Sequence, residues 1–199
     1  MPERAPHGET GSVLVESNRL LIRRPEEADR RNLERVFCDP AMMRHLGAPW
    51  TPGKVADALR EWREGWGVDD RWYGVLIRKG APEAIGTAGV TADTIPGEPG
   101  LELSWFVLPE HQRQGFATEI THELLRFAFD VVGAERVLAE THPDNPASNS
   151  VLEKAGFECL GERHHTYDYL PGFEVQVLWG TTRGSWRRGT TSTSRPPGR

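Results

Sequence analysis

The 199-residue sequence predicts an α+β protein built on one mixed, mostly antiparallel sheet. Strand-like runs separated by Gly and Pro turns fill the middle of the chain, which is typical of antiparallel hairpins. A strand, a helix and another strand follow, the pattern of a parallel crossover unit. The length and the 37% hydrophobic content indicate one domain with a substantial core.

The first half of the chain predicts two helices and four strands. Residues 13–23 form a strand, and Pro25 opens a helix whose apolar face holds Leu33, Val36 and Phe37. Thr51 caps a second helix that has Pro52 at its first position. Three antiparallel strands are expected next, at residues 72–78, 85–93 and 101–108.

The second half predicts two further helices and three strands. The first helix ends at Gly133 and carries an apolar stripe of Ile120, Leu124, Phe127 and Val131. Residues 136–140 form the parallel strand, and a short helix runs from Asn145 to Gly156. Two last strands, 157–169 and 173–181, turn at residues 170–172. The total is seven strands and about four helices.

One domain is expected over residues 13–183, with flexible arms at 1–12 and 185–199. Both arms lack a periodic apolar pattern, and Trp186 is the one large apolar residue of the second. The chain has two cysteines, Cys38 and Cys159, no leader-like start and no long apolar run, so a cytoplasmic location is expected. Cys38 lies on an apolar stripe and is interpreted as a core residue.

The charge pattern limits the partners. The net charge is −5, and residues 184–199 hold four Arg and no acid, so the rest of the chain is more acidic still. Such a body disfavours nucleic acid and suits cationic amines. No membrane partner is expected. A homodimer is possible, with Trp179 and Trp186 as candidate contacts.

The connection between the fourth expected strand and the next helix has the composition of an anion-binding loop: Gln112, Arg113, Gln114, Gly115, Phe116, Ala117 and Thr118. Free N–H groups at a helix start attract phosphate oxygens, and Gly and Ala leave room for them. No ATP-type or dinucleotide-type glycine motif is present. An ordinary strand-to-helix turn is the alternative.

This loop fits the pattern [QR]-x-x-G-x-[GA] and resembles the pyrophosphate loop of the Gcn5-related N-acetyltransferase (GNAT) family. Three further blocks occur in the family's order: RLLIR at 19–23, ELSW at 102–105, and NPAS at 145–148 followed by VLEKAGF at 151–157. They are similar to the RimJ/RimL-type branch, over about residues 16–186. The resemblance implies the GNAT fold, with its parallel strands splayed at the centre, and acetyl-CoA as co-substrate.

The resemblance also implies roles for individual residues. The loop holds the diphosphate, Asn145 contacts the cofactor, and Ser148 protonates the leaving thiolate. The cofactor arm pairs with backbone groups of Phe106, Val107 and Leu108, and an N–H near Phe106 or Val107 polarises the thioester carbonyl. Asn145 is explained equally well as a helix cap. Leu152 stands where many family members have a Tyr acid, so Ser148, water or unassisted departure remain open.

Glu102 is the candidate general base, because it shares a strand face with Ser104 and Phe106 and a substrate ammonium must lose a proton. A solvated or ion-paired carboxylate is the alternative. Trp62 and Trp66, one helical turn apart, are packing residues or an aromatic wall of the acceptor site.

The sequence therefore predicts direct acetyl transfer to a primary amine, either a protein N-terminus or a small molecule. A non-catalytic CoA-binding sensor or partner module is the alternative. No metal is expected, because His164 and His165 point to opposite strand faces and their spacing with Cys159 and His142 fits no zinc pattern.

Overall fold

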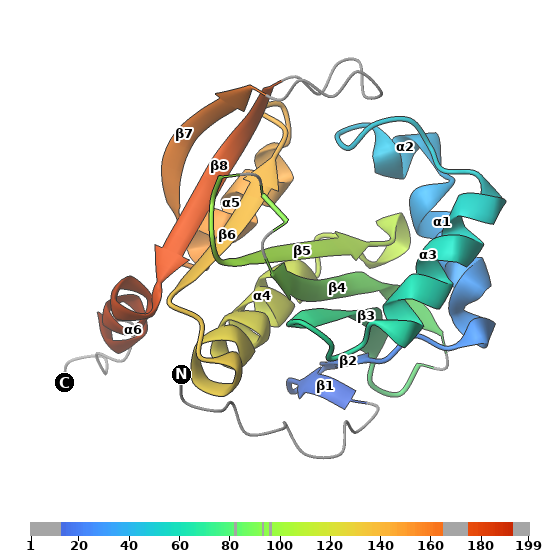
Figure 1. The fold of residues 1–199 in the computed structure, drawn as a ribbon, viewed down its shortest axis with the longest axis horizontal. Coiled ribbons are helices and arrows are strands. Elements are labelled where there is room, and N and C mark those ends of the chain that lie inside the picture. The colour runs from blue at the N-terminus through green and yellow to red at the C-terminus, as the bar shows by residue number, and fades with distance from the viewer. Residues whose placement is uncertain (1–12, 82, 93, 96, 165–174, 193–199) are drawn as a thin grey trace.

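The structure is a computed structural model that describes residues 13–81, 83–92, 94–95, 97–164 and 175–192. Within them, a single sheet has eight strands in the order β1-β2-β3-β4-β5-β6-β8-β7 (Figure 1). The strands are β1 (Val13–Glu16), β2 (Leu20–Arg23), β3 (Arg71–Arg78), β4 (Ala84–Ala92), β5 (Leu101–Val107), β6 (Arg136–Thr141), β7 (Glu158–His164) and β8 (Val175–Thr182).

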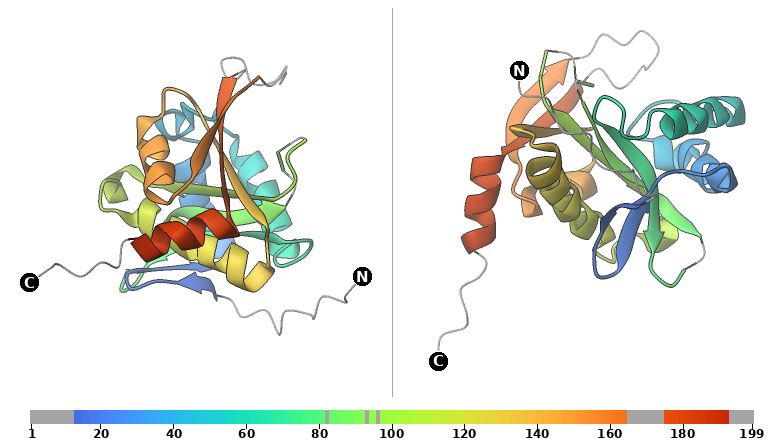
Figure 2. Two further views of the ribbon diagram at one scale, coloured as in Figure 1. Left: turned by 90° about the vertical axis from the view of Figure 1, so that its left-hand side faces the viewer. Right: turned by 60° about the horizontal axis from the view of Figure 1, so that its bottom comes forward.

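Helices cover both faces of this sheet (Figure 2). The α-helices are α1 (Arg30–Phe37), α2 (Pro40–Met43), α3 (Pro52–Glu64), α4 (Phe116–Arg126), α5 (Pro146–Lys154) and α6 (Arg183–Ser192). Short 3₁₀ turns lie at Glu27–Asp29 and Pro109–His111. All strand pairs are antiparallel except β5 with β6, which α4 connects. The predicted α+β class and central parallel pair are confirmed.

Two apolar clusters follow from the alternation of side chains along the strands. The α4 and α5 face holds Leu101, Leu103 and Val107 of β5. The α1 and α3 face holds a second cluster, which includes the predicted helix face of Leu33, Val36 and Phe37 and is bordered by Phe106. The odd and even positions of β5 therefore point to opposite faces, as its sequence pattern predicts.

The region 13–23, predicted as one strand, is a hairpin of β1 and β2, which raises the strand count from seven to eight. Ser17 closes the turn: its N–H donates to the Leu20 carbonyl at 2.9 Å, and its hydroxyl accepts from the Leu20 N–H at 3.0 Å. The turn was missed because Ser and Asn can reverse the chain without a glycine, so the residues on either side look like one continuous strand.

The apolar stripe predicted after the loop is correct over α4 but not at its end. Residues Phe127–Val132 form a π-helical segment, and Gly133 ends it with φ of +82°. Because a π turn contains more residues than an α turn, Val131 rotates to solvent with 54% exposed, and Val132 takes the buried place. The α-helical spacing therefore misplaced the last member of the stripe.

The C-terminal segment continues in helical form beyond the expected domain boundary. Residues 185–192, predicted as part of a flexible arm, belong to α6, whose Trp186 packs on Phe129 with 5.4 Å between ring centroids. Trp179 and Trp186 are both buried in the chain's own core, so neither offers a dimer contact. Residues 1–12, 193–199 and the predicted turn at 170–172 lie outside the described residues.

No helix in the described part of the chain is long and apolar enough to cross a membrane.

Candidate functional site

The central feature of the site is a gap between β5 and β6. These parallel strands pair only at Leu101 with Val137 and at Glu102 with Leu138, although β5 continues to Val107 and β6 to Thr141. The two strands therefore diverge beyond Glu102. The resemblance implied two parallel strands that splay apart at the centre of the sheet, and β5 and β6 do so.

The antiparallel pairing with β4 decides which backbone groups of β5 face the gap. Leu108 donates its N–H to the Ile85 carbonyl at 2.9 Å, in register with the β4–β5 ladder. Hydrogen-bonded pairs alternate in such a ladder, so Phe106 bonds to β4, whereas the N–H and C=O of Trp105 and Val107 point away from it. The Val107 carbonyl accepts from Gln112 Nε2 at 2.8 Å. This favours the Val107 N–H, rather than that of Phe106, as the donor that faces the gap.

The loop of residues 112–118 begins where β5 ends and leads directly into α4. Arg113 and Gly115 have φ of +58° and +79°. Alternating left- and right-handed residues turn successive N–H groups toward a common anion. Gly115 is the N-cap of α4 and supplies no side-chain cap, so the first N–H groups of the helix have no partner from that residue. This geometry suits phosphate oxygens.

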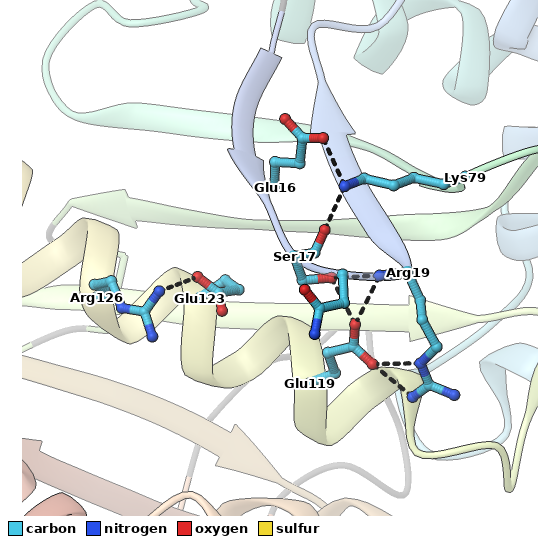
Figure 3. Close-up of a pocket in the computed structure, with 8 residues that line it drawn as sticks. Glu16, Ser17, Arg19, Lys79, Glu119, Glu123 and Arg126 are labelled. Carbon is cyan, nitrogen blue, oxygen red and sulfur yellow. Dashed lines mark hydrogen bonds and ion pairs between the residues drawn. The ribbon is translucent and has the colours of Figure 1, made fainter.

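Arg19 braces this loop from the N-terminal hairpin (Figure 3). Its NH1 donates to the Gln114 carbonyl at 3.1 Å, and its Nε donates to Glu119 Oε2 at 2.7 Å in the first turns of α4. Its guanidinium also lies over the Phe116 ring, 4.7 Å from the centroid. Sequence reasoning gave Arg19 no role beyond its place in the RLLIR block, because no local pattern relates it to a loop about a hundred residues away.

The Glu119 carboxylate accepts most of the hydrogen bonds that join the N-terminal hairpin to α4. Ser17 donates its hydroxyl to Glu119 Oε1 at 2.6 Å, beside the Arg19 contacts. Burial acts to raise the pKa of Glu119, but the hydrogen bonds from Ser17 and Arg19 outweigh it and hold that pKa below its ordinary value. The carboxylate therefore stays charged and keeps the hairpin on α4.

A pocket of about 630 Å³ opens beside the brace and is separate from the gap. Its lining is charged, and oppositely charged side chains are paired within it, as Lys79 is with Glu16 at 2.6 Å and Arg126 with Glu123 at 2.9 Å (Figure 3). No residue of β5 or β6 lines it. It holds none of the predicted catalytic residues.

Glu102 lies at the base of the gap, on the strand face that it shares with Ser104 and Phe106. The Thr94 hydroxyl donates to its Oε2. Burial raises the pKa of Glu102, the Thr94 hydrogen bond offsets part of this effect, and the charge of Glu140 raises the pKa further. A carboxylate whose pKa is raised in this way is a stronger base than an ordinary one, which suits proton abstraction.

Helix α5 lies across the opposite face of the sheet. Asn145 is its N-cap, because its Oδ1 accepts from the Ser148 N–H at 3.2 Å. Helix α5 is tied to β6 by Thr141, which donates to Asn149 Oδ1 at 2.7 Å and accepts from Trp179 Nε1 at 2.9 Å. Asn145 and Ser148 therefore lie at the start of a helix that follows β6 and packs, through Leu152 and Ala155, on the sheet face opposite Glu102.

The other sequence candidates lie in the core or at the surface. Leu152, in the place of the family's Tyr acid, is fully buried. Cys38 packs against the α1–α3 cluster, and burial raises the pKa of its thiol. Cys159 is exposed. In the described part of the chain, no group of three or more His, Cys, Asp or Glu side chains is placed to hold a metal ion.

The two tryptophans considered as an acceptor wall separate onto different faces. Helix α3 ends at Glu64, before Trp66, which joins the α4–α5 cluster. Trp62 remains on the α1–α3 face, 5.7 Å from the Phe37 ring. Phe37 in turn lies 5.2 Å from Phe106 of β5. The aromatic cluster beside the gap therefore contains Trp62 without Trp66.

Comparison with known proteins gives a consistent result. The model of the Acetyltransferase (GNAT) domain family matches residues 19–158. An uncharacterized N-acetyltransferase, YoaA, of Bacillus subtilis is 27% identical over 175 residues, which is 82% of this chain and 94% of that protein.

Two solved structures share the fold. Spermidine N-acetyltransferase from Vibrio cholerae, in complex with CoA and spermine, has a TM-score of 0.70 at 17% identity and covers 86% of this chain and 99% of its own. Ribosomal-protein-S5-alanine acetyltransferase from Vibrio fischeri has a TM-score of 0.69 at 21% identity, and the match covers 86% of this chain and 97% of that one. At these identities the likeness concerns the fold and leaves the acceptor unassigned.

Proposed function

The chain belongs to the GNAT acetyltransferase family and is an acetyl-CoA-dependent N-acetyltransferase, and we propose that it acetylates a primary amine bound at the β5–β6 gap together with acetyl-CoA. The acetyl group passes directly to the amine, without a covalent enzyme intermediate. Most of the rate enhancement comes from holding the two reactants on one rigid sheet.

The observation that carries this proposal is the joining of an anion-binding loop to a strand gap. The loop of residues 112–118 turns N–H groups toward one side with positive φ at Arg113 and Gly115, and α4 adds its positive dipole end. The gap begins on the strand that feeds this loop. Coenzyme A fits this pair of features, because its diphosphate is anionic and its pantetheine arm is long enough to pair with strand backbone.

Each residue has a stated task in the transfer. Acetyl-CoA, when bound, supplies the acetyl thioester. Loop residues 112–118 bind the diphosphate, and Val107, whose backbone faces the gap while Phe106 and Leu108 bond to β4, pairs with the arm and offers its N–H as oxyanion donor. Glu102 Oε1 or Oε2 takes the proton from the acceptor nitrogen, directly or through water. Asn145 orients the arm, and the Ser148 hydroxyl donates a proton to the departing sulfur.

The acceptor belongs to one of two classes. The RLLIR, ELSW and NPAS blocks resemble the RimJ/RimL-type branch and favour a protein N-terminus. Fold neighbours include a spermidine acetyltransferase, which keeps a small amine in consideration. Mass spectrometry of ribosomal proteins from cells with and without the gene separates the two: a protein acceptor loses the mass of one acetyl group in the deletion strain, and unchanged masses favour the small amine.

The proposed function is tested with the purified full chain. Calorimetry with coenzyme A measures binding, and a thiol-release assay with acetyl-CoA and a panel of peptides and small amines measures turnover. We expect binding by the wild type and turnover with at least one amine. Binding without turnover over the whole panel contradicts the proposed transfer and favours a CoA sensor. Lack of CoA binding contradicts the assignment of the loop.

A further inference from the structure

We propose that Arg19 is a positioning residue for the cofactor: its guanidinium holds the Gln114 carbonyl and thereby turns the Gly115 N–H toward the diphosphate of coenzyme A. The inference rests on the proposed function, because it names what keeps the same cofactor loop in its binding conformation. Arg19 therefore controls cofactor affinity in addition to the packing of the N-terminal hairpin.

The peptide unit between Gln114 and Gly115 is the part of the loop that Arg19 contacts. A trans peptide unit is planar, so its C=O and its N–H point in opposite directions. None of the peptide bonds in the described segments is cis. Arg19 NH1 donates to the Gln114 carbonyl at 3.1 Å. The Gly115 N–H, which belongs to the same peptide unit, therefore points away from the guanidinium.

The loop needs such a restraint because Gly115 does not fix its own backbone. Its φ is +79°, and glycine adopts positive and negative φ about equally well. A rotation of the Gln114–Gly115 peptide plane therefore meets little resistance from the glycine, and it would reverse the direction of both the C=O and the N–H. The hydrogen bond from Arg19 opposes this reversal.

Arg19 is itself held at its backbone and at its side chain (Figure 3). Its C=O accepts from the Lys79 N–H at 2.8 Å, and its N–H donates to Glu119 Oε1 at 3.2 Å. Its Nε donates to Glu119 Oε2 at 2.7 Å, and its NH2 lies 2.5 Å from the same oxygen. Because two nitrogens contact one carboxylate, the plane of the guanidinium is fixed and NH1 is directed at the loop.

The same contacts favour positioning over direct binding of phosphate by Arg19. Each of the three guanidinium nitrogens has a protein partner, either Glu119 or the Gln114 carbonyl. The flat face of the group lies over the Phe116 ring, 4.7 Å from the centroid. Its charge is compensated at close range by the Glu119 carboxylate, so a phosphate group gains little from it directly.

Arg19→Met tests the proposal through the Kd for coenzyme A. Methionine keeps apolar length next to Phe116 but removes the donors, so we expect the Kd to rise about tenfold, the scale of one charge-assisted hydrogen bond. Arg19→Lys keeps the charge but lacks the planar fork that reaches Glu119 and Gln114 together, and its Kd should rise nearly as much. At saturating acetyl-CoA, kcat and the KM for the amine should stay at the wild-type values in both variants.

Glu119→Gln separates positioning from direct attraction between charges. Positioning predicts weaker binding of coenzyme A, because the guanidinium is no longer held in one plane. Direct contact with phosphate predicts tighter binding, because a competing carboxylate is lost. The matched control is Glu123→Gln, which removes an equal charge four residues further along α4, where the partner is Arg126 at 2.9 Å. In the Arg19→Met background, Glu119→Gln should weaken binding no further.

A second ligand shows which part of coenzyme A responds. Dephospho-CoA has the same diphosphate but lacks the 3′-phosphate, so Arg19→Met is expected to weaken both ligands by the same factor. Calorimetry measures the two Kd values well below the lowest melting temperature of the set. Thermal melts of all variants verify that the compared proteins are folded.

The possible outcomes separate this inference from the proposed function. A lower melting temperature with an unchanged Kd in Arg19→Met means a purely structural contact, which overturns the inference and leaves the proposed function standing. Full recovery in Arg19→Lys, tighter binding in Glu119→Gln than in Glu123→Gln, or a loss for CoA without one for dephospho-CoA each overturns it as well. The expected Kd pattern in a protein that acetylates no amine supports the inference and contradicts the transfer. A wild type that does not bind coenzyme A contradicts both.

Discussion

At the scale of single residues, Glu102 combines burial with a like charge. A carboxyl group with a raised pKa in the folded chain keeps its proton to a higher pH than in the unfolded chain. The raised pKa of Glu102 therefore stabilises the folded state fully at pH values below the ordinary carboxyl pKa. This stabilisation is lost as the pH rises through the pKa of Glu102 in the folded state. A site that abstracts protons therefore carries a cost in stability at neutral pH.

Glu102→Gln is expected to increase the free energy of unfolding at neutral pH relative to the wild type, and the difference should shrink as the pH falls toward about 4, the ordinary carboxyl range. Urea unfolding at a series of pH values measures it. Glu64→Gln, at an exposed position ending α3, is the control and should show no such trend. Parallel stability curves for Glu102→Gln and the wild type would contradict the assigned burial effect.

Asn145 serves as helix cap and as proposed cofactor contact, and two variants separate the roles. Asp caps a helix as well as Asn does, so Asn145→Asp should keep the melting temperature but weaken CoA binding, because it replaces an amide with a negative charge. Asn145→Ala should cost about 1 kcal/mol of stability and also weaken binding. Wild-type CoA affinity in Asn145→Asp would mean that Asn145 serves only as a helix cap.

At the scale of elements, the loop of residues 112–118 depends on a backbone conformation that side chains rarely adopt. Gly115 has φ of +79°, and an added Cβ would lie 3.6 Å from Arg19 NH2, so the position has some space but a restrictive backbone. Gly80, in the turn between β3 and β4, has φ of +81° and open space around it. The two glycines form a matched pair for testing the loop.

Gly115→Val and Gly80→Val should each lose about 1–2 kcal/mol of stability, because a β-branched residue is strained at positive φ. Only Gly115→Val should lose coenzyme A binding, since its relaxation reorients the N–H groups that face the diphosphate. Denaturant unfolding and calorimetry measure the two effects. Equal CoA affinity in both variants would be incompatible with a diphosphate site in this loop.

Periodicity predicted the interiors of the elements well and their ends less well. The cap at Thr51, the helix face of α1 and the three-strand meander are all present. The errors lie where the local period changes: the Ser17 turn inside a β-like run, and the π segment that exchanges Val131 for Val132. Hydrophobic spacing carries no signal for such changes, because the residue types on either side are the same.

At the scale of the whole molecule, α6 is part of the fold. Trp186 is 9% exposed and belongs to the apolar cluster under α4. Its neighbour Phe129 lies in the π segment, at the opposite end of the α4 helical run from the loop that precedes Phe116. We therefore expect this contact to support stability and not cofactor binding.

Trp186→Ala should cost about 3–5 kcal/mol, the usual loss for truncating a buried aromatic residue. Coenzyme A affinity, measured well below the melting temperature, should remain at the wild-type value. Val131→Ala, at an exposed position of the neighbouring π segment, is the control and should cost less than about 0.5 kcal/mol. A small loss in Trp186→Ala would mean that α6 does not pack on the core.

The sequence alone predicted most of the order of the elements and the loop of residues 112–118 between a strand and a helix, because each depends on residues close together in the chain. Only the tertiary structure decided that Arg19 holds Gln114 and Glu119, and that β5 and β6 pair through Glu102 and Leu138 and separate beyond them. These contacts join segments far apart in sequence. Strand register and crossover geometry bring them together, and neither is encoded in any local spacing.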